Sequence, residues 1–415
     1  MARSAASSVT EMKPELPTDP RRQMFSLVII MLAIFSLGVS LGMMAVVFPT
    51  SMEALGFSRS LIGTVMSMET LASVLVCFMM VSLFRYIGLR LGLVFSTLLR
   101  LPPLVALAYF QDLNFWVVMA LMHGLGSGIF FLQLQTWLNS IPFQTSRGFK
   151  IALFGTSISL GLSLGPVVLQ FIDAMQPLIA QIANLCRLEI TDYALQAPFF
   201  AIAFVSFLAL IPVLLGFFVM PSLKSAKRMA LLPLINESKG VLYGLAFGGA
   251  SLFGVSSFIT LYGMQNGLTL TDASLLLTSF MLGGLLLEAP IAWISDHFDR
   301  RYVIIAAVLL SLVCSVYLPI AIYRSYQAWI LLFLWGGVVG AIYSISLTIL
   351  GEKYPAEELV SVNAAYSVME NSGGVVGAVL IGLSMDLFGS DGLPYVILFT
   401  GLCYFTFALT RYKVE

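Results

Sequence analysis

The chain has 415 residues, of which 59% are hydrophobic and only 10% are charged, and its formal net charge is zero. A soluble globular protein carries about 25% charged residues and at most roughly half apolar ones, so the composition argues against a soluble enzyme and against a disordered protein. The zero net charge leaves no basic surface for phosphates, which argues against a nucleic-acid-binding protein. The composition is typical of an integral membrane protein with many spans.

Residue types that form disulfides or bind metals are few and scattered. Three of the four cysteines fall inside apolar runs, and Cys186, in a polar loop, has no cysteine near it in that loop. The two histidines, His123 and His297, are far apart in the sequence. Neither a disulfide framework nor a zinc site follows from this spacing, and no cofactor is expected.

Continuous apolar runs of about 20 residues, each long enough for a transmembrane helix, are separated by charged or turn-rich breaks. The runs do not alternate apolar with polar residues, as the strands of a membrane β-barrel do. The sequence therefore predicts an all-α membrane protein. Twelve spans are expected, at about 24–48, 60–83, 91–110, 114–138, 151–171, 198–220, 240–263, 272–293, 302–323, 326–350, 360–385 and 393–410.

The most polar internal stretch, 221–239, divides these spans into six and six. Residues 172–197 are expected to form a long loop between the fifth and sixth spans. The predicted parts are a cytoplasmic tail over 1–23, an N-terminal six-helix half over 24–220, a cytoplasmic linker over 221–239, a C-terminal six-helix half over 240–410 and a cytoplasmic tail over 411–415.

Lys and Arg in the loops predict the orientation, because cytoplasmic loops carry an excess of both. With a cytoplasmic N-terminus, 17 of the 21 Lys and Arg residues lie on the cytoplasmic side and 3 on the outer side, while Arg100 lies within a span. We therefore expect a multi-pass membrane protein with both termini in the cytoplasm.

Small residues recur inside several spans, where they allow helices to approach closely. Gly38 and Gly42 are four residues apart in the first span, as are Gly161 and Gly165 in the fifth, and the eleventh span contains Gly373, Gly374 and Gly377. Two interpretations stay open, namely static packing and helices that slide or rock during a transport cycle.

The loop between the eighth and ninth spans carries a recognisable pattern. It reads Ala292-Trp293-Ile294-Ser295-Asp296-His297-Phe298-Asp299-Arg300-Arg301. A small residue, an aspartate four positions later and a basic pair after a tight turn resemble the signature of the major facilitator superfamily. The six-plus-six arrangement of spans also resembles that superfamily, so the resemblance covers nearly the whole chain.

The resemblance implies the major facilitator fold, a solute site between the two halves and alternating access by rocking. It also implies a gating latch formed by Asp296, Asp299, Arg300 and Arg301, since a carboxylate and guanidinium groups form strong hydrogen bonds. A plain positive-inside anchor is the alternative. In the equivalent loop of the first half, Arg85 stands at the aspartate position, so the latch is one-sided.

Two further stretches narrow the resemblance. Span four ends in Gln135-Thr136-Trp137-Leu138-Asn139, and span seven ends in Leu261-Tyr262-Gly263. Together with the loop that contains Asp296, these stretches resemble the YcaD-like bacterial branch of the superfamily. This resemblance implies that the protein lies in the bacterial cytoplasmic membrane.

Ionisable residues within the membrane are costly, so each is a candidate functional residue. Glu69 and Arg100 lie at similar depths in spans two and three, which predicts a buried ion pair. Either this pair is structural, or Arg100 binds an anionic group while Glu69 exchanges protons. Glu370, in span eleven, and Glu288, near the cytoplasmic end of span eight, are further candidates for proton coupling.

Polar residues of spans four and eleven are candidates for lining the solute cavity. In span eleven, one helical face carries Asn363, Ser367, Glu370, Gly374 and Gly377, and this stripe faces either the cavity or a neighbouring helix. Asn371, next to Glu370, is a further cavity candidate. In span four the cavity candidates are His123, Gln133 and Gln135, and His123 is either a hydrogen-bonding core residue or part of a proton relay.

These features predict a secondary active transporter that moves a small organic solute by alternating access with proton coupling. No phosphate-binding G-x4-G-K-[ST] loop is present, which disfavours ATP as the driving force. The alternative is a non-transporting receptor or scaffold on a transporter fold; a membrane enzyme is disfavoured because no nucleophile–base pair is evident. The expected partners are a small-molecule substrate, protons and the lipid bilayer, with no nucleic acid, and the chain is expected to be a monomer.

Overall fold

The computed structural model describes residues 20–141, 147–185, 188–220, 238–354 and 359–411. Most of the predicted tail over 1–23, of the linker over 221–239 and of the tail over 411–415 therefore lies outside the described residues. The boundaries of those segments stay predictions.

The described residues form helices joined by short turns. In the first half these are α1 (Pro20–Ala54), α2 (Arg59–Tyr86), α3 (Gly88–Leu107), α4 (Leu113–Ser140), α5 (Arg147–Leu169), α6 (Gln176–Leu185), α7 (Tyr193–Leu208) and α8 (Leu210–Gly216). In the second half they are α10 (Lys239–Gln265), α11 (Leu270–Ser295), α12 (Arg300–Ala321), α13 (Ser325–Lys353), α14 (Leu359–Phe388), the 3₁₀ turn η1 (Gly389–Asp391) and α15 (Gly392–Arg411).

Within the described chain, 11 stretches are long and apolar enough to cross a membrane. The last stretch, Ala365–Thr410, contains both α14 and α15, while α7 and α8 together form the single stretch Tyr193–Gly216. The all-α architecture is confirmed, and with α14 and α15 taken separately the twelve expected spans are present. The segment 172–197 is not simply a loop, since it contains α6, which buries Ile179 and Ala183.

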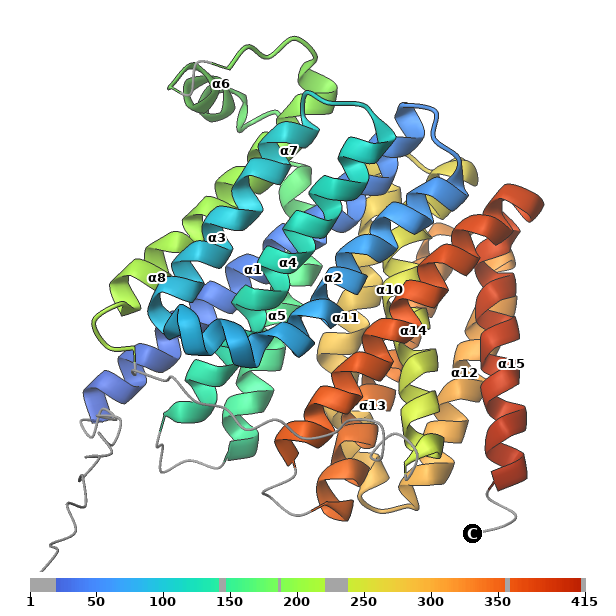
Figure 1. Cartoon of the computed structure of the whole chain (residues 1–415). Helices are drawn as coiled ribbons and strands as arrows, with labels where there is room; N and C mark the ends of the chain where they lie inside the picture. The colour runs from blue at the N-terminus through green and yellow to red at the C-terminus, as the bar shows by residue number, and fades with distance from the viewer. Residues whose placement is uncertain (1–19, 142–146, 186–187, 221–237, 355–358, 412–415) are drawn as a thin grey trace, which may run out of the picture.

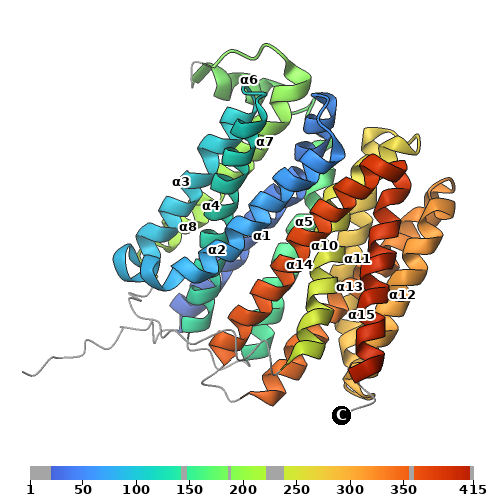
Figure 2. The ribbon, with the colours of Figure 1, turned by 45° about the vertical axis from the view of Figure 1, so that its right-hand side comes forward.

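The helices form two groups that lie side by side (Figure 1). We call the end where α1 begins and α15 ends the terminal face, and the end where α1 ends at Ala54 and α2 begins at Arg59 the distal face. Helix α6 lies at the distal face, above the bundle in Figure 1. The groups meet where α2 packs against α14 and α5 against α11, and Figure 2 shows α2 and α14 next to each other at this boundary.

The outer helices expose large apolar side chains, which is typical of a surface in contact with lipid. Leu98 of α3, Leu215 of α8, Val313 of α12 and Phe399 of α15 are each at least half exposed. Because lipid is as apolar as these side chains, their exposure costs little in a membrane and the helices need another source of cohesion.

Glycines provide that cohesion between the first and fifth helices of each half. A Cβ atom on Gly165 of α5 would lie 2.6 Å from the backbone carbon of Gly42 in α1. In the second half, a Cβ on Gly377 of α14 would lie 2.7 Å from the Cα of Ala250 in α10. The backbones of these helices therefore touch directly.

Equivalent turns join the first two helices of each half. Gly56, between α1 and α2, has φ 82°, and Gly267, between α10 and α11, has φ 89°. These positive values favour glycine because it has no Cβ. Two residues after each glycine, Ser58 and Thr269 accept hydrogen bonds from backbone N–H groups of the following helix, so the two halves are built as structural repeats.

Replacement of Gly165 by Ala tests the backbone contact between α1 and α5. The added Cβ overlaps backbone atoms that cannot rotate away, so we expect the free energy of unfolding to fall by about 1–3 kcal/mol. The measurement is the thermal unfolding midpoint of the purified protein in detergent. Gly155→Ala is the matched control on the same helix, because a Cβ there meets no atom within 4 Å; equal midpoints for the two variants would contradict the packing argument.

Candidate functional site

In the first half, a carboxylate and a histidine form a hydrogen-bonded pair inside the helical bundle. Glu69 Oε1 of α2 lies 2.9 Å from Nδ1 of His123 in α4. His123 is fully buried, and the Glu69 side chain is 17% exposed. Gly124 allows this approach, since a Cβ there would lie 2.8 Å from the Cα of Glu69. This contact fits the interpretation of His123 as a hydrogen-bonding core residue, and its cavity role stays a prediction.

Arg100 does not form the expected direct ion pair with Glu69. It is fully buried, and its guanidinium carbon lies 4.8 Å from the centre of the Phe130 ring, in the range of a cation–π contact. In the described structure its three guanidinium nitrogens have no hydrogen-bond partner, and Glu69 acts on it only as a nearby charge. The physical reason is that α4 packs against both α2 and α3, so the direct partner of Glu69 comes from α4.

The two glutamines of α4 occupy different environments. Gln133 is fully buried. A Cβ on Gly92 of α3 would lie 2.8 Å from the amide carbon of Gln133, so this amide packs directly against α3. Gln133 is therefore placed between α3 and α4, and its cavity role stays a prediction. Gln135 is half-buried, and its predicted cavity role stays a prediction.

In the second half, Glu288 of α11 accepts a hydrogen bond from the hydroxyl of Ser344 in α13. Gly340, one turn before Ser344, lies against the same carboxylate; a Cβ there would be 3.2 Å from Glu288 Oε2. Small residues on α13 therefore admit a charged side chain between two helices. The partner of Glu288 in the structure is a hydroxyl of a neighbouring helix.

Glu370 of α14 belongs to the same polar region. It is half-buried, and its carboxylate is close enough to Glu288 for the two charges to interact. Tyr366, one turn earlier, donates a hydrogen bond of 3.3 Å to the carbonyl of Tyr343 in α13, and the two rings are 4.9 Å apart. The sequence predicted separate roles for the two glutamates and gave no sign of the tyrosines, because the fold alone brings α11, α13 and α14 together.

The polar stripe predicted on α14 divides between two environments. Gly374 and Gly377 pack against Phe253 and Ala250 of α10, so this part of the stripe is a helix–helix contact. Asn371 donates a hydrogen bond of 2.7 Å to the carbonyl of Ser367. The cavity role of these two side chains stays a prediction, and the side chain of Asn363 lies outside the described residues.

The predicted latch residues lie at the terminal face of the second half. Nη2 of Arg300 is 2.9 Å from Oδ1 of Asp296, and Nη1 of Arg300 bonds to Glu352 at the end of α13. Asp299 caps α12 by accepting a hydrogen bond of 2.9 Å from the N–H of Arg301. Glu352 was not predicted, since nothing in its local sequence marks it. Arg300 thus links α11, α12 and α13, all within one half.

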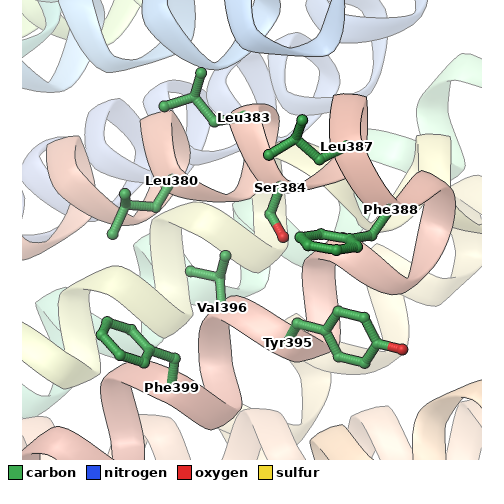
Figure 3. A pocket seen from close by; sticks show the side chains of 8 residues that line it. All are labelled: Leu380, Leu383, Ser384, Leu387, Phe388, Tyr395, Val396 and Phe399. Carbon is green, nitrogen blue, oxygen red and sulfur yellow. The ribbon is translucent and has the colours of Figure 1, made fainter.

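A hollow between the distal ends of α14 and α15 is apolar (Figure 3). It is lined by Leu380, Leu383, Ser384, Leu387, Phe388, Tyr395, Val396 and Phe399. Several of these side chains are exposed on the surface of the bundle that faces lipid. The hollow lacks charged groups, so it does not match the polar region around Glu288 and Glu370.

Comparisons with known solved structures support the fold. A mutant of the nucleoside transporter NupG has a TM-score of 0.72 at 10% identity and covers 93% of this chain and 99% of its own. A bacterial homolog to the human lysosomal transporter Spinster, in an inward-facing and occupied conformation, has a TM-score of 0.76 at 12% identity and covers 95% of this chain and 97% of its own. At these identities the likeness shows the fold alone.

Sequence comparisons identify the family. The uncharacterized MFS-type transporter YfkF of Bacillus subtilis (strain 168) is 22% identical over 383 residues, which cover 91% of this chain and 93% of that protein. The model of the Major Facilitator Superfamily matches residues 30–273 and 241–415, nearly the whole chain. This protein therefore belongs to the Major Facilitator Superfamily and is a multi-pass, non-enzymatic membrane transporter for a small-molecule substrate.

Proposed function

We propose that the protein is a monomeric, proton-coupled secondary transporter that moves a small organic solute across the bacterial cytoplasmic membrane by alternating access, with both termini in the cytoplasm. The observation that carries the proposal is the presence of carboxylates between helices of both halves, namely Glu69 in the first half and Glu288 and Glu370 in the second. Each lies on a helix, α2, α11 or α14, that packs against the other half.

The two glutamates of the second half favour a proton as the coupling ion. A charge within the membrane costs several kcal/mol unless it is paired with an opposite charge. The partner of Glu288 is a neutral hydroxyl, and the charge that acts on Glu370 is the carboxylate of Glu288. Binding of a proton removes both the desolvation cost and the repulsion between the carboxylates, so their charge can change during a cycle.

In the first half, the candidate for proton coupling is Glu69, which is bonded to His123. The Glu69 side chain retains some exposure while His123 is fully buried, so Glu69 is the member of the pair that is open to its surroundings. Movement of the two halves changes the surroundings of α2, because α2 packs against α14.

The proton proposal is tested with liposomes that contain the purified protein and an internal pH dye, to which small solutes are added one at a time. A solute that moves protons only in the presence of the protein identifies substrate and coupling ion together. We then expect Glu370→Gln to abolish the pH dependence of transport, since the amide cannot bind a proton. Glu189→Gln, an exposed loop position, is the control.

Two outcomes would count against this proposal. An unchanged pH profile in Glu370→Gln would exclude Glu370 as the proton carrier. Specific binding of a solute without net movement would favour the alternative of a receptor on a transporter fold.

A second prediction concerns the group of Asp296, Arg300 and Glu352. The carboxylate side chains of Asp296 and Glu352 are 56% and 63% exposed, so each contributes at most about 1 kcal/mol. We expect Asp296→Asn or Glu352→Gln alone to slow transport by roughly fivefold or less, because Arg300 keeps one partner. The double variant should be slower than the product of the two single effects, and initial rates of solute uptake measure this.

Equal transport by the double variant and the unmodified protein would count against a role of Asp296, Arg300 and Glu352 in the transport cycle. Protein level and elution profile on size-exclusion chromatography provide the control for folding. With both unchanged, a loss of rate reports on the transport cycle.

A further inference from the structure

Asp386, near the distal end of α14, bonds to the start of α2 in the other half. Its Oδ1 accepts a hydrogen bond of 2.9 Å from the backbone N–H of Arg59, and its Oδ2 accepts one of 2.9 Å from the N–H of Ser60. The hydroxyl of Ser60 also donates to Oδ2. One carboxylate therefore satisfies the first N–H groups of α2, which have no partner within their own helix and attract negative charge.

The backbones beneath this carboxylate hold the two helices in contact. Gly382 precedes Asp386 by one turn of α14, and a Cβ there would lie 3.2 Å from the Cα of Ser60. One turn into α2, a Cβ on Gly63 would lie 3.1 Å from the carbonyl carbon of Ala378. Asp386 is thus fixed opposite the start of α2, and separation of α2 from α14 at the distal face must break all three hydrogen bonds.

A second set of contacts extends this connection to α1 and α10. Nη2 of Arg59 lies 3.5 Å from Oε1 of Glu53 at the end of α1. The same oxygen accepts a hydrogen bond of 3.1 Å from Nε2 of Gln265 at the end of α10. Nη1 of Arg59 donates to the carbonyl of Met385 at 3.5 Å. Four helices, two from each half, are therefore bonded together at this face.

We propose that Asp386 and the start of α2 form a latch that keeps the distal face closed while the terminal face opens. The hydrogen bonds described above join the two halves, and all of them lie at the distal face. The group of Asp296, Arg300 and Glu352, at the terminal face, stays within one half. With the termini in the cytoplasm, the latch closes the extracellular side, and it rests on the proposed alternating access.

The experiment measures the opening of the distal face directly, without a substrate. Spin labels are attached to Ala54→Cys in the first half and Leu387→Cys in the second, both exposed positions of the distal face, in a background without the native cysteines. Double electron–electron resonance then gives the distance distribution between the labels. The test variants are Asp386→Ala and Ser60→Ala, and Asp391→Asn, in η1 on the same face, is the control.

The expected result is a population with a longer distance that grows in Asp386→Ala. The ratio of open to closed molecules should rise at least tenfold, because the loss of a single hydrogen bond to a charged group accounts for roughly that factor and this variant removes three. Ser60→Ala keeps the two backbone hydrogen bonds and should shift the distribution less, and Asp391→Asn should leave it unchanged.

An unchanged distribution in folded Asp386→Ala would overturn the latch. Should that variant fail to fold, Asp386→Asn replaces it, because the amide keeps one acceptor oxygen and loses the charge; an unchanged distribution there would have the same consequence. The liposome flux assay distinguishes the two proposals. A distance shift in a protein that moves no solute supports the latch and counts against the transport cycle. Solute flux without a distance shift supports the transport cycle and counts against the latch.

Discussion

The direct contact of helix backbones through glycine is the constraint on which the structure depends. Lipid provides no hydrophobic force between helices, so cohesion must come from close packing and from polar contacts. Gly42 against Gly165 and Ala250 against Gly377 bring the first and fifth helices of each half together at backbone distance. The same two helices are joined in each half, so equivalent helices lie at the contact between the halves. There α2 packs against α14, and α5 packs against α11.

This packing also decides which charged groups become neighbours. In each half, a carboxylate of the second helix bonds to the fourth helix, Glu69 to His123 and Glu288 to Ser344. Glycines on the fourth helix lie beside these residues, Gly124 against the backbone of Glu69 and Gly340 against the carboxylate of Glu288. Small residues thus serve two purposes, since they join the helices and leave room for the charged groups that would otherwise be excluded from a membrane interior.

The sequence predicts the fold well because its evidence is local. Apolar runs of about 20 residues give the spans, and the Asp296–Arg301 pattern gives the family, without knowledge of any contact. The pairing of Glu69 with His123 could not be predicted in this way, since depth along a span does not reveal which helix lies beside it. Glu352 and Asp386 carry no local signal at all, and Asp386 meets Ser60 across 326 residues of chain.

The two faces of the bundle differ in what their charged groups connect. Arg300 at the terminal face holds three helices of one half together, so it can stay intact while the halves rotate. Asp386 at the distal face bonds to the other half, so rotation that opens this face must break it. An alternating cycle needs both kinds of contact, because a half that moves as a rigid body must be held internally while its contacts with the other half form and break. In the proposed cycle, this rotation alters the surroundings of the carboxylates between the helices, because α2, α11 and α14 pack against the other half.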